Sequence, residues 1–247
     1  MKKQLICAVA LSAILISCAS PLPISQLSSD ETPGRWVAGR KYITQTQGDQ
    51  SLTLSYYRNE GNMLIFDALF ENQGSQAIEF SPGYAQIIGL NEEKQEISRA
   101  LAIDPEEKLL EFDKSESRAK AQLSNQITSN ALFATTDLIA TVVEETDPQI
   151  SRAETDASYN RREWDRTDRL NDINRQESYL ESIRNTRLYW EEAPIRRTTV
   201  LSNEYIEGRF FFDRNNDAKF YIISFDIPDA GVFTFQFEQQ LIKPFNE

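Results

Sequence analysis

Hydrophobic and polar residues alternate along much of the first half of the chain. Leu64, Phe66 and Phe70, for example, fall on one side of an extended backbone, with more polar residues between them. A period of two is typical of strands with one buried face, and turn-forming pairs such as Gly48-Asp49 separate the runs. The pattern predicts strands at residues 36–47, 50–57, 63–72, 76–81, 84–90 and 96–103.

At residue 104 the apolar spacing changes to three and four, the period of a helix. Asp104 is a favoured helix N-cap and Pro105 a favoured first helical residue, so a helix is predicted to begin there. The spacing continues to Val142 and predicts a helix that ends before Asp147. A break at Thr135-Thr136 is the open alternative, because β-branched residues lower helix propensity.

A second helix is predicted from about residue 157 to residue 192. Its apolar seam has the spacing of a heptad repeat and comprises Leu170, Ile173, Leu180 and Ile183. Neither helix can bury its apolar stripe alone. The two are therefore predicted to pack against each other as an antiparallel hairpin with coiled-coil character.

Strand-like alternation returns after Pro194 and predicts strands at residues 198–201, 208–213, 219–227 and 231–241. This second β region, residues 198–243, is near the lower size limit for folding alone without disulfides. We expect it to join the first region, residues 35–103, in one antiparallel β-sandwich. The helical hairpin, residues 104–197, is then an insert, and the fold class is α+β. The alternative is three consecutive pieces with a separate small C-terminal sheet.

Two segments carry a family resemblance. Glu71-Asn72-Gln73-Gly74-Ser75 and Tyr205-Ile206-Glu207-Gly208-Arg209-Phe210-Phe211-Phe212 resemble the strand and turn sequences of immunoglobulin-like domains in secreted bacterial lipoproteins of unknown function. The resemblance covers about half of the chain. It implies that the predicted sandwich is immunoglobulin-like, a class whose domains have about 100 residues.

The N-terminus has the features of a secretory signal. Lys2 and Lys3 precede an apolar run of about a dozen residues, and the small residue Ser17 precedes Cys18. Leu15-Ile16-Ser17-Cys18 resembles the lipobox of bacterial lipoproteins. The alternative is an ordinary cleaved signal, but no Ala-x-Ala motif marks a better cleavage site nearby.

The lipobox resemblance implies that residues 1–17 are a signal peptide that is removed. Cys18 would then be acylated on sulfur, as by palmitate, and on its new amino group, and multiple acyl chains hold a protein stably on a membrane. Residues 18–34 would form a lipidated tether. Ala19 and Ser20 follow the cysteine in place of an aspartate, which in the family's sorting logic implies the outer membrane of a two-membrane bacterium.

Composition excludes several kinds of chemistry. Without residues 1–17 the chain has 24 basic and 38 acidic residues, a net charge of −14, which repels nucleic acid. There is no histidine, and the two cysteines are Cys7, in the signal, and Cys18. These absences exclude a disulfide framework, thiolate catalysis, serine triads and histidine metal sites. No cofactor is predicted.

Asp213, Asn215 and Asp217 alternate like the first ligands of a calcium-binding loop. Such a loop requires a glycine next and a glutamate at its twelfth position, where this chain has Ala218 and Ser224. A turn between two strands explains the same residues, because Asn and Asp tolerate positive φ. The turn is the preferred interpretation.

The second predicted helix carries candidates for a protein interface. They are Trp164, Tyr179, Tyr189, Trp190, Arg161 and Arg162, which belong to residue types that dominate interface energetics. In the alternative interpretation the aromatic rings pack inside the protein and the arginines pair with nearby acids.

These features predict a non-enzymatic, lipid-anchored cell-envelope protein. Its helical arm and sandwich would serve as an interaction scaffold for an envelope protein partner. The alternative is a carbohydrate- or peptide-binding module that uses exposed aromatic residues such as Trp36, Tyr42 and Tyr84.

A carboxylate-dependent hydrolase is the third hypothesis. Adjacent carboxylates on a helix diverge by about 100°, unlike the facing pair of a glycosidase, and the adjacent pairs here are Glu106-Glu107, Glu144-Glu145 and Glu191-Glu192.

Overall fold

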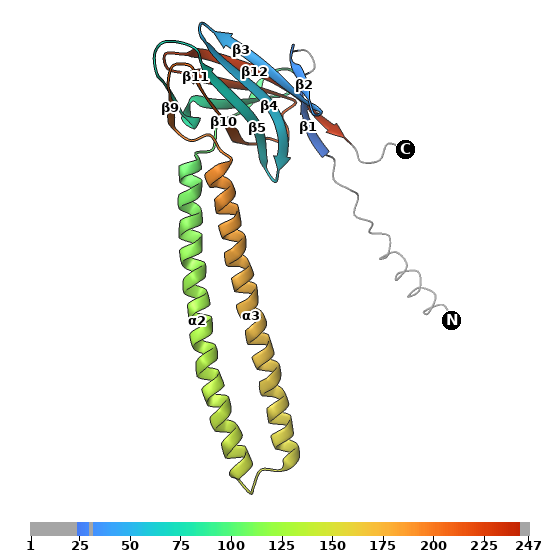
Figure 1. Ribbon diagram of the computed structural model, residues 1–247. Helices are drawn as coiled ribbons and strands as arrows, with labels where there is room; N and C mark the ends of the chain where they lie inside the picture. Colours follow the sequence, from blue (N-terminus) through green and yellow to red (C-terminus); the bar gives the residue numbers. More distant parts are fainter. Residues whose placement is uncertain (1–23, 30–31, 243–247) are drawn as a thin grey trace, which may run out of the picture.

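Two antiparallel sheets pack together above a long helical hairpin (Figure 1). The computed structural model describes residues 24–29 and 32–242, so the predicted signal peptide and Cys18 lie outside the described residues. The first sheet has the strand order β1-β12-β11-β7-β8, with bounds Ile24–Ser28, Gly231–Ile242, Phe220–Ile227, Ala85–Leu90 and Glu96–Leu101. The second has the order β10-β5-β4-β3-β2, with bounds Glu204–Asp213, Met63–Asn72, Gln50–Glu60, Arg40–Gln47 and Arg35–Val37. A separate pair joins β6 to β9, Ile78–Phe80 and Thr198–Val200, and a 3-10 turn, η1, covers Pro82–Tyr84.

Phenylalanine side chains fill the space between the two sheets. The ring centroids of Phe66 and Phe237 lie 5.1 Å apart, and those of Phe210 and Phe225 lie 5.0 Å apart. Each of these contacts joins a strand of the second sheet to a strand of the first. All four rings are buried, which confirms the inward direction predicted for Phe66.

Strands from both sides of the helical insert share the same sheets. β10 pairs with β5, and β11 lies between β12 and β7. The alternative of three consecutive pieces is therefore wrong, whereas the α+β class, with antiparallel sheets and a helical hairpin, is confirmed.

An immunoglobulin-like topology is not confirmed. β2 to β5 are neighbours in chain order, whereas immunoglobulin sheets combine strands ABED and CFG.

Two local predictions need correction. Residues 36–47 form two strands rather than one, because Ala38 and Gly39 adopt positive φ angles of 48° and 78° and turn the chain. Residues 24–28 fall within the predicted tether of residues 18–34, but they form β1. The edge of β12 that β11 leaves free pairs with this segment from Ile24↔Ile242 to Ser28↔Glu238.

The hairpin, which we call the arm, consists of α2, Pro105–Thr146, and α3, Arg152–Glu192. The Asp104 side chain accepts a hydrogen bond from the Glu106 amide, so the predicted N-cap is confirmed. α2 continues without a break through Thr135. With 42 residues it is about 63 Å long. α3 begins earlier than predicted, because Ser151 and Glu154 form a capping box.

Strand β10 holds both ends of the arm. Before α2, the Ile103 amide donates to the Phe211 carbonyl at 2.8 Å. After α3, the Arg209 amide donates to the Ala193 carbonyl at 2.9 Å, and the Ile195 amide donates to the Arg209 carbonyl at 3.0 Å. Gly208 permits this approach, since a Cβ there would lie 2.8 Å from the Ile195 side chain.

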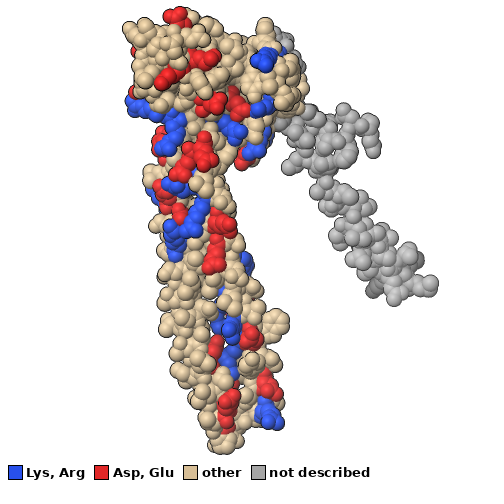
Figure 2. Space-filling model, viewed as in Figure 1, with Lys and Arg blue, Asp and Glu red and all other residues tan. Residues whose placement is uncertain are grey.

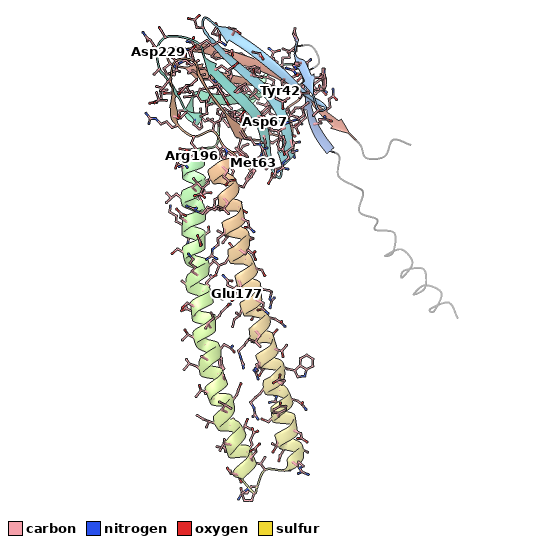
Figure 3. The ribbon with its side chains drawn as sticks, viewed as in Figure 1. Tyr42, Met63, Asp67, Glu177, Arg196 and Asp229 are labelled. Atoms are coloured by element: carbon pink, nitrogen blue, oxygen red, sulfur yellow. The ribbon has the colours of Figure 1, made fainter. Side chains whose placement is uncertain are left out.

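Three consecutive phenylalanines in β10 point alternately to the two faces of the sheet. Phe210 and Phe212 enter the sandwich core, and Phe211 points outward beneath the arm. Its ring centroid lies 4.5 Å from that of Trp190, and Leu109 of α2 and Ile65 of β5 complete this buried cluster. We call this junction the root of the arm; Met63 and Arg196 mark its position in Figure 3.

Asn72, at the end of β5, connects the sandwich segments before and after the arm. Its Nδ2 donates to the carbonyls of Gln76 at 2.7 Å, Val200 at 3.1 Å and Leu201 at 3.2 Å, and its Oδ1 accepts from the Gly74 amide at 3.1 Å. The side chain is fully buried. It therefore satisfies several backbone groups that water does not reach.

We predict that Asn72→Asp lowers the free energy of unfolding by roughly 3 kcal/mol, because an acceptor replaces a buried donor opposite three carbonyl oxygens. Urea denaturation measures the change. Asn216→Asp in the exposed turn before β11 is the matched control, with an expected change within about 0.5 kcal/mol. Equal stability of Asn72→Asp and the parent chain would contradict the role of this network.

Candidate functional site

The calcium candidate lies in the turn between β10 and β11. The Asn215 Oδ1 accepts a hydrogen bond from the Asp217 amide at 2.9 Å, and the Arg214 amide donates to the Asn62 carbonyl at 2.8 Å. Asp213 and Asp217 are exposed. These contacts belong to the turn and give the calcium interpretation no geometric support.

The predicted interface residues of α3 do not form one patch. Tyr189 and Trp190 lie in the root, where Trp190 is 4 % exposed against Phe211. Arg162 lies between the helices in an ion pair with Glu144. Arg161, Tyr179 and Trp164 remain exposed on α3, Trp164 to 77 %. The structure thus divides these residues among the root, the helix interface and the outside of the arm.

In each of the three adjacent glutamate pairs, one glutamate forms an ion pair with an arginine. Glu106 pairs with Arg196, Glu144 with Arg162 and Glu191 with Arg187. The three pairs belong to the start of α2, the end of α2 and the end of α3. None of these adjacent pairs presents two carboxylates facing each other across a cleft, the arrangement that glycoside hydrolysis requires.

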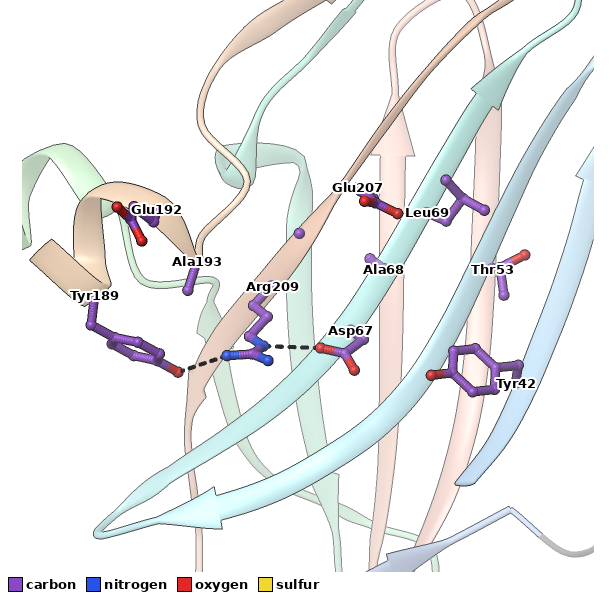
Figure 4. Close-up of a pocket in the computed structure, with 11 residues that line it drawn as sticks. Tyr42, Thr53, Asp67, Ala68, Leu69, Tyr189, Glu192, Ala193, Glu207 and Arg209 are labelled. Atoms are coloured by element: carbon purple, nitrogen blue, oxygen red, sulfur yellow. Dashed lines mark hydrogen bonds and ion pairs between the residues drawn. The ribbon is translucent and has the colours of Figure 1, made fainter. Parts of the chain in front are cut away.

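A groove of about 590 Å³ opens beside the root, between the end of α3 and the outer face of the second sheet (Figure 4). Arg209 projects from β10 into its centre, where its Nε lies 3.0 Å from Asp67 Oδ1 and its Nη1 donates to the Tyr189 hydroxyl at 3.5 Å. Tyr42 lies on the far wall, and Glu192 comes from the last turn of α3.

Of the aromatic residues predicted to bind a ligand, only Tyr42 lines this groove. Trp36 is exposed on β2. Tyr84 lies elsewhere and donates its hydroxyl hydrogen to Glu79 at 2.9 Å. Sequence reasoning missed Arg209, Asp67 and the contribution of Tyr189, because these residues are far apart in the chain and only the fold brings them together.

The interface between α2 and α3 is polar over most of its length. Near the sandwich, Ala119 packs with Leu180 and Ile183. Further out, Arg169 pairs with Asp137 at 3.1 Å. Towards the tip, the Arg162 guanidinium donates two hydrogen bonds to Glu144, at 2.7 and 2.8 Å.

The predicted seams are therefore only partly confirmed. Leu180 and Ile183 are buried, but Leu170 is exposed. In α2 the apolar stripe advances mainly in steps of four residues, and each such step rotates it by about 40°. Ala119 consequently faces α3, whereas Leu138 and Val142 lie on the outside, exposed to 69 % and 60 %.

The outside of α2 carries an uncharged, exposed seam whose members alternate in steps of three and four. We call it the outer α2 face; it comprises Ser117, Ala121, Ser124, Thr128, Ala131, Thr135, Leu138 and Val142, all exposed. Ile127, Leu132 and Ile139 flank it and are also exposed. In Figure 2 the α2 side of the lower arm is largely uncharged, while charged side chains follow α3 and the upper arm.

The outer α2 face and its apolar flanks are uncharged but fall short of the hydropathy of a membrane span. Among the described residues, no helix contains a stretch long and apolar enough to cross a bilayer. Monomeric soluble proteins rarely leave extended apolar patches uncovered, and such patches mark interaction sites. The outer α2 face is therefore the main candidate for an interaction surface.

The polar interior of the arm predicts a defined acid sensitivity. Hydrogen bonds from Arg162, and then from Ser158, lower the pKa of Glu144 from 4.5 to about 2. A carboxylate with a lowered pKa in the folded state stabilises that state fully above its unfolded pKa, and this contribution is lost as the pH falls towards the folded pKa. The contribution of the Glu144–Arg162 ion pair to the packing of the two helices is therefore expected to be lost from about pH 4.5 down to about pH 2.

NMR titration of the Glu144 carboxyl group is expected to give a midpoint near pH 2 in the parent chain. Arg162→Gln removes the main cause of the shift and should move the midpoint up towards 4.5. Circular dichroism over the same range reports the accompanying change in helix content. A midpoint near 4.5 in the parent chain would contradict the ion pair.

Searches of protein-family models, of curated proteins and of solved structures found no match to this chain.

Proposed function

We propose that the protein is a non-enzymatic, lipid-anchored protein of the cell envelope, held on the outer membrane of a two-membrane bacterium through Cys18. In this proposal the sandwich is a rigid support and the arm is its docking element. The observation that carries the proposal is the outer α2 face, an uncharged seam about 38 Å long from Ser117 to Val142 that is flanked by exposed apolar residues and that nothing in the chain covers among the described residues.

The attachment of the arm supports this role. Both ends of the arm are hydrogen-bonded to β10, and the root buries Phe211 and Trp190 against each other. A flexible insert of this length would lose much conformational freedom on binding a partner. Two capped helices fixed to a sandwich have already lost most of that freedom, so the outer α2 face is presented in a preformed state.

The position of the proposed anchor also fits. β1 begins at Ile24, six residues after Cys18, and six extended residues span at most about 20 Å. An anchor at Cys18 therefore keeps the sandwich close to the membrane surface. The arm, about 63 Å long, is longer than this connecting segment.

Photo-crosslinking in intact cells tests the proposal. A photoreactive amino acid at Leu132 or Ile139, both on the exposed α2 side, is expected to give a discrete crosslinked protein that mass spectrometry identifies. The matched control places the same group at Asp168, exposed on α3, where no discrete product is expected. Cys18→Ser should move the protein out of the membrane fraction. Equal labelling at all three positions would remove the basis for a docking arm.

The groove supports a second candidate function, the binding of a small carbohydrate. Tyr42 and Tyr189 offer aromatic rings on either side of it, and Arg209, Asp67 and Glu207 offer polar groups between them. Sites for small ligands commonly combine apolar walls with a few fixed polar groups. The observation that favours this candidate is the convergence of these residues from four separate elements, β3, β5, β10 and α3.

A glycan array probed with the full chain tests the second candidate. For any glycan that binds, Tyr42→Ala is expected to weaken affinity at least about tenfold, since the loss of one good contact of about 1.4 kcal/mol has that effect. Tyr84→Ala, outside the groove, is the matched control and should leave binding unchanged. Equal weakening by both variants, or no bound glycan, would count against the groove as the site.

A further inference from the structure

We propose that the outer α2 face docks against the same face of a second copy of this chain, with the two α2 helices antiparallel. This inference rests on the proposed function, in which the arm is a docking element, and it names the partner. Four observations support it: the spacing of the seam, the sizes of its side chains, the state of its hydroxyl groups and the charges at its two ends.

The spacing of the seam fixes the register. Its members are separated alternately by three and four residues, as in a heptad repeat. If the second helix runs antiparallel, the three-residue intervals of one seam align with the three-residue intervals of the other only in a few registers. These registers differ from one another by seven residues. In the register that aligns the uncharged stretch with itself, Ser117 lies opposite Val142, and Ala121 lies opposite Leu138.

The side-chain sizes complement each other in this register. Each of the two largest side chains, Leu138 and Val142, meets a small residue, Ala121 or Ser117. Towards the two-fold axis, Ser124 meets Thr135 and Thr128 meets Ala131. A parallel pairing would instead place large on large at the tip and small on small near the sandwich, and the helices would splay apart. The antiparallel pairing keeps their separation even, which close packing requires.

The two threonine hydroxyls of the seam do not oppose its burial. The Thr128 Oγ1 donates to the Ser124 carbonyl at 2.9 Å, and the Thr135 Oγ1 donates to the Ala131 carbonyl at 3.0 Å. Both hydroxyls are satisfied within the helix. A second helix can cover these threonines without leaving their hydroxyl groups unpaired.

Charges at the ends of the seam complement each other in the same register. Continuing the alternation by one step in each direction reaches Lys114 and Glu145, both exposed. The antiparallel register places Lys114 of one copy opposite Glu145 of the other, twice in the dimer. Neither side chain forms a salt bridge within the described part of its own chain, so both charges remain available.

The geometry and charge of the arm favour a second copy over a lipid surface. In the proposed register the end of one α2 lies beside about residue 113 of the other, roughly 12 Å from the start of that helix, so the contact is complete before the sandwich is reached. Helices that lie in a membrane interface are typically rich in Lys and Arg. Residues 105–192 contain 12 basic and 19 acidic residues, a balance that anionic lipid repels.

Disulfide trapping of the full chain in intact cells tests the proposal. Two tagged copies are co-expressed, one with Ala121→Cys and the other with Leu138→Cys; the parent chain controls for any thiol at Cys18. The mixed pair is expected to give a disulfide-linked dimer of both tags, at a yield at least about fivefold above that of either variant alone. Ser129→Cys, exposed on α2 but off the seam, is the matched control and should give no dimer.

Charge exchange tests the register independently. In the trapped pair, Lys114→Glu or Glu145→Lys in both copies should lower the yield of mixed dimer several-fold, and the double variant should restore it. All of these positions are exposed, so the variants do not disturb the core. A homodimer of Ala121→Cys as strong as the mixed dimer would overturn the antiparallel arrangement. Failure of the double variant to restore the yield would overturn the register.

The outcomes separate this inference from the proposed function. If trapping fails while photo-crosslinking at Leu132 identifies a different envelope protein, the arm is a docking element and the second copy is the wrong partner. If crosslinking at Leu132 yields only lipid adducts, the face lies on the membrane, and both proposals fail. If trapping succeeds and the Leu132 product has twice the mass of the chain, both stand.

Discussion

Phe211 points out of the sandwich, and the ring of Trp190 at the end of α3 covers it at a centroid distance of 4.5 Å. Its neighbours Phe210 and Phe212 point the other way into the sandwich core. One strand therefore belongs to the core and to the root of the arm at once. Because the main chain of β10 also holds both ends of the arm, the direction in which each helix leaves and its rotation about its own axis are set at the root.

That rotation explains why the arm has polar contacts inside and apolar residues outside. With Ala119 fixed towards α3, the helix period places Asp137 and Glu144 on the inner side and Leu138 and Val142 on the outer side. The inner acids meet arginines of α3 in partly buried ion pairs, with side-chain exposures of 15 % for Arg162 and 18 % for Glu144. These contacts fix which residues of the two helices lie opposite each other. Beyond the root, the outer α2 face and the exposed apolar residues that flank it are left without a partner within the described residues.

Much of the fold is readable from local sequence. The alternation around Phe66 and the N-cap at Asp104 each depend only on residues a few positions away in the sequence, and both predictions are confirmed. The capping box of Ser151 and Glu154 is equally local, and it places the start of α3 earlier than its apolar spacing does. Strand β1 was not predictable from its own composition, because only the free edge of β12 makes it a strand.

The candidate sites were harder to predict for a physical reason. An apolar stripe indicates which residues avoid water, but not which surface covers them. A stripe with four-residue spacing also rotates around the helix by about 40° at each step, so its two ends face different surfaces. The groove depends even more on tertiary structure, since Tyr42, Tyr189 and Arg209 meet only after the sandwich and the arm have formed. The lipobox differs from both because its meaning is entirely local, and Cys18 lies outside the described residues.

The groove and the outer α2 face share one mechanical connection, the root. In the carbohydrate-binding proposal a ligand would contact the last turn of α3 as well as β10 and β5, so it would add contacts across the root. By linkage, a ligand that prefers one angle between the arm and the sandwich favours that angle by the same free energy. Pairing of two arms would restrict the same angle through α2. The carbohydrate-binding and docking proposals are therefore compatible, since Arg209 and Tyr189 lie where the groove meets the root.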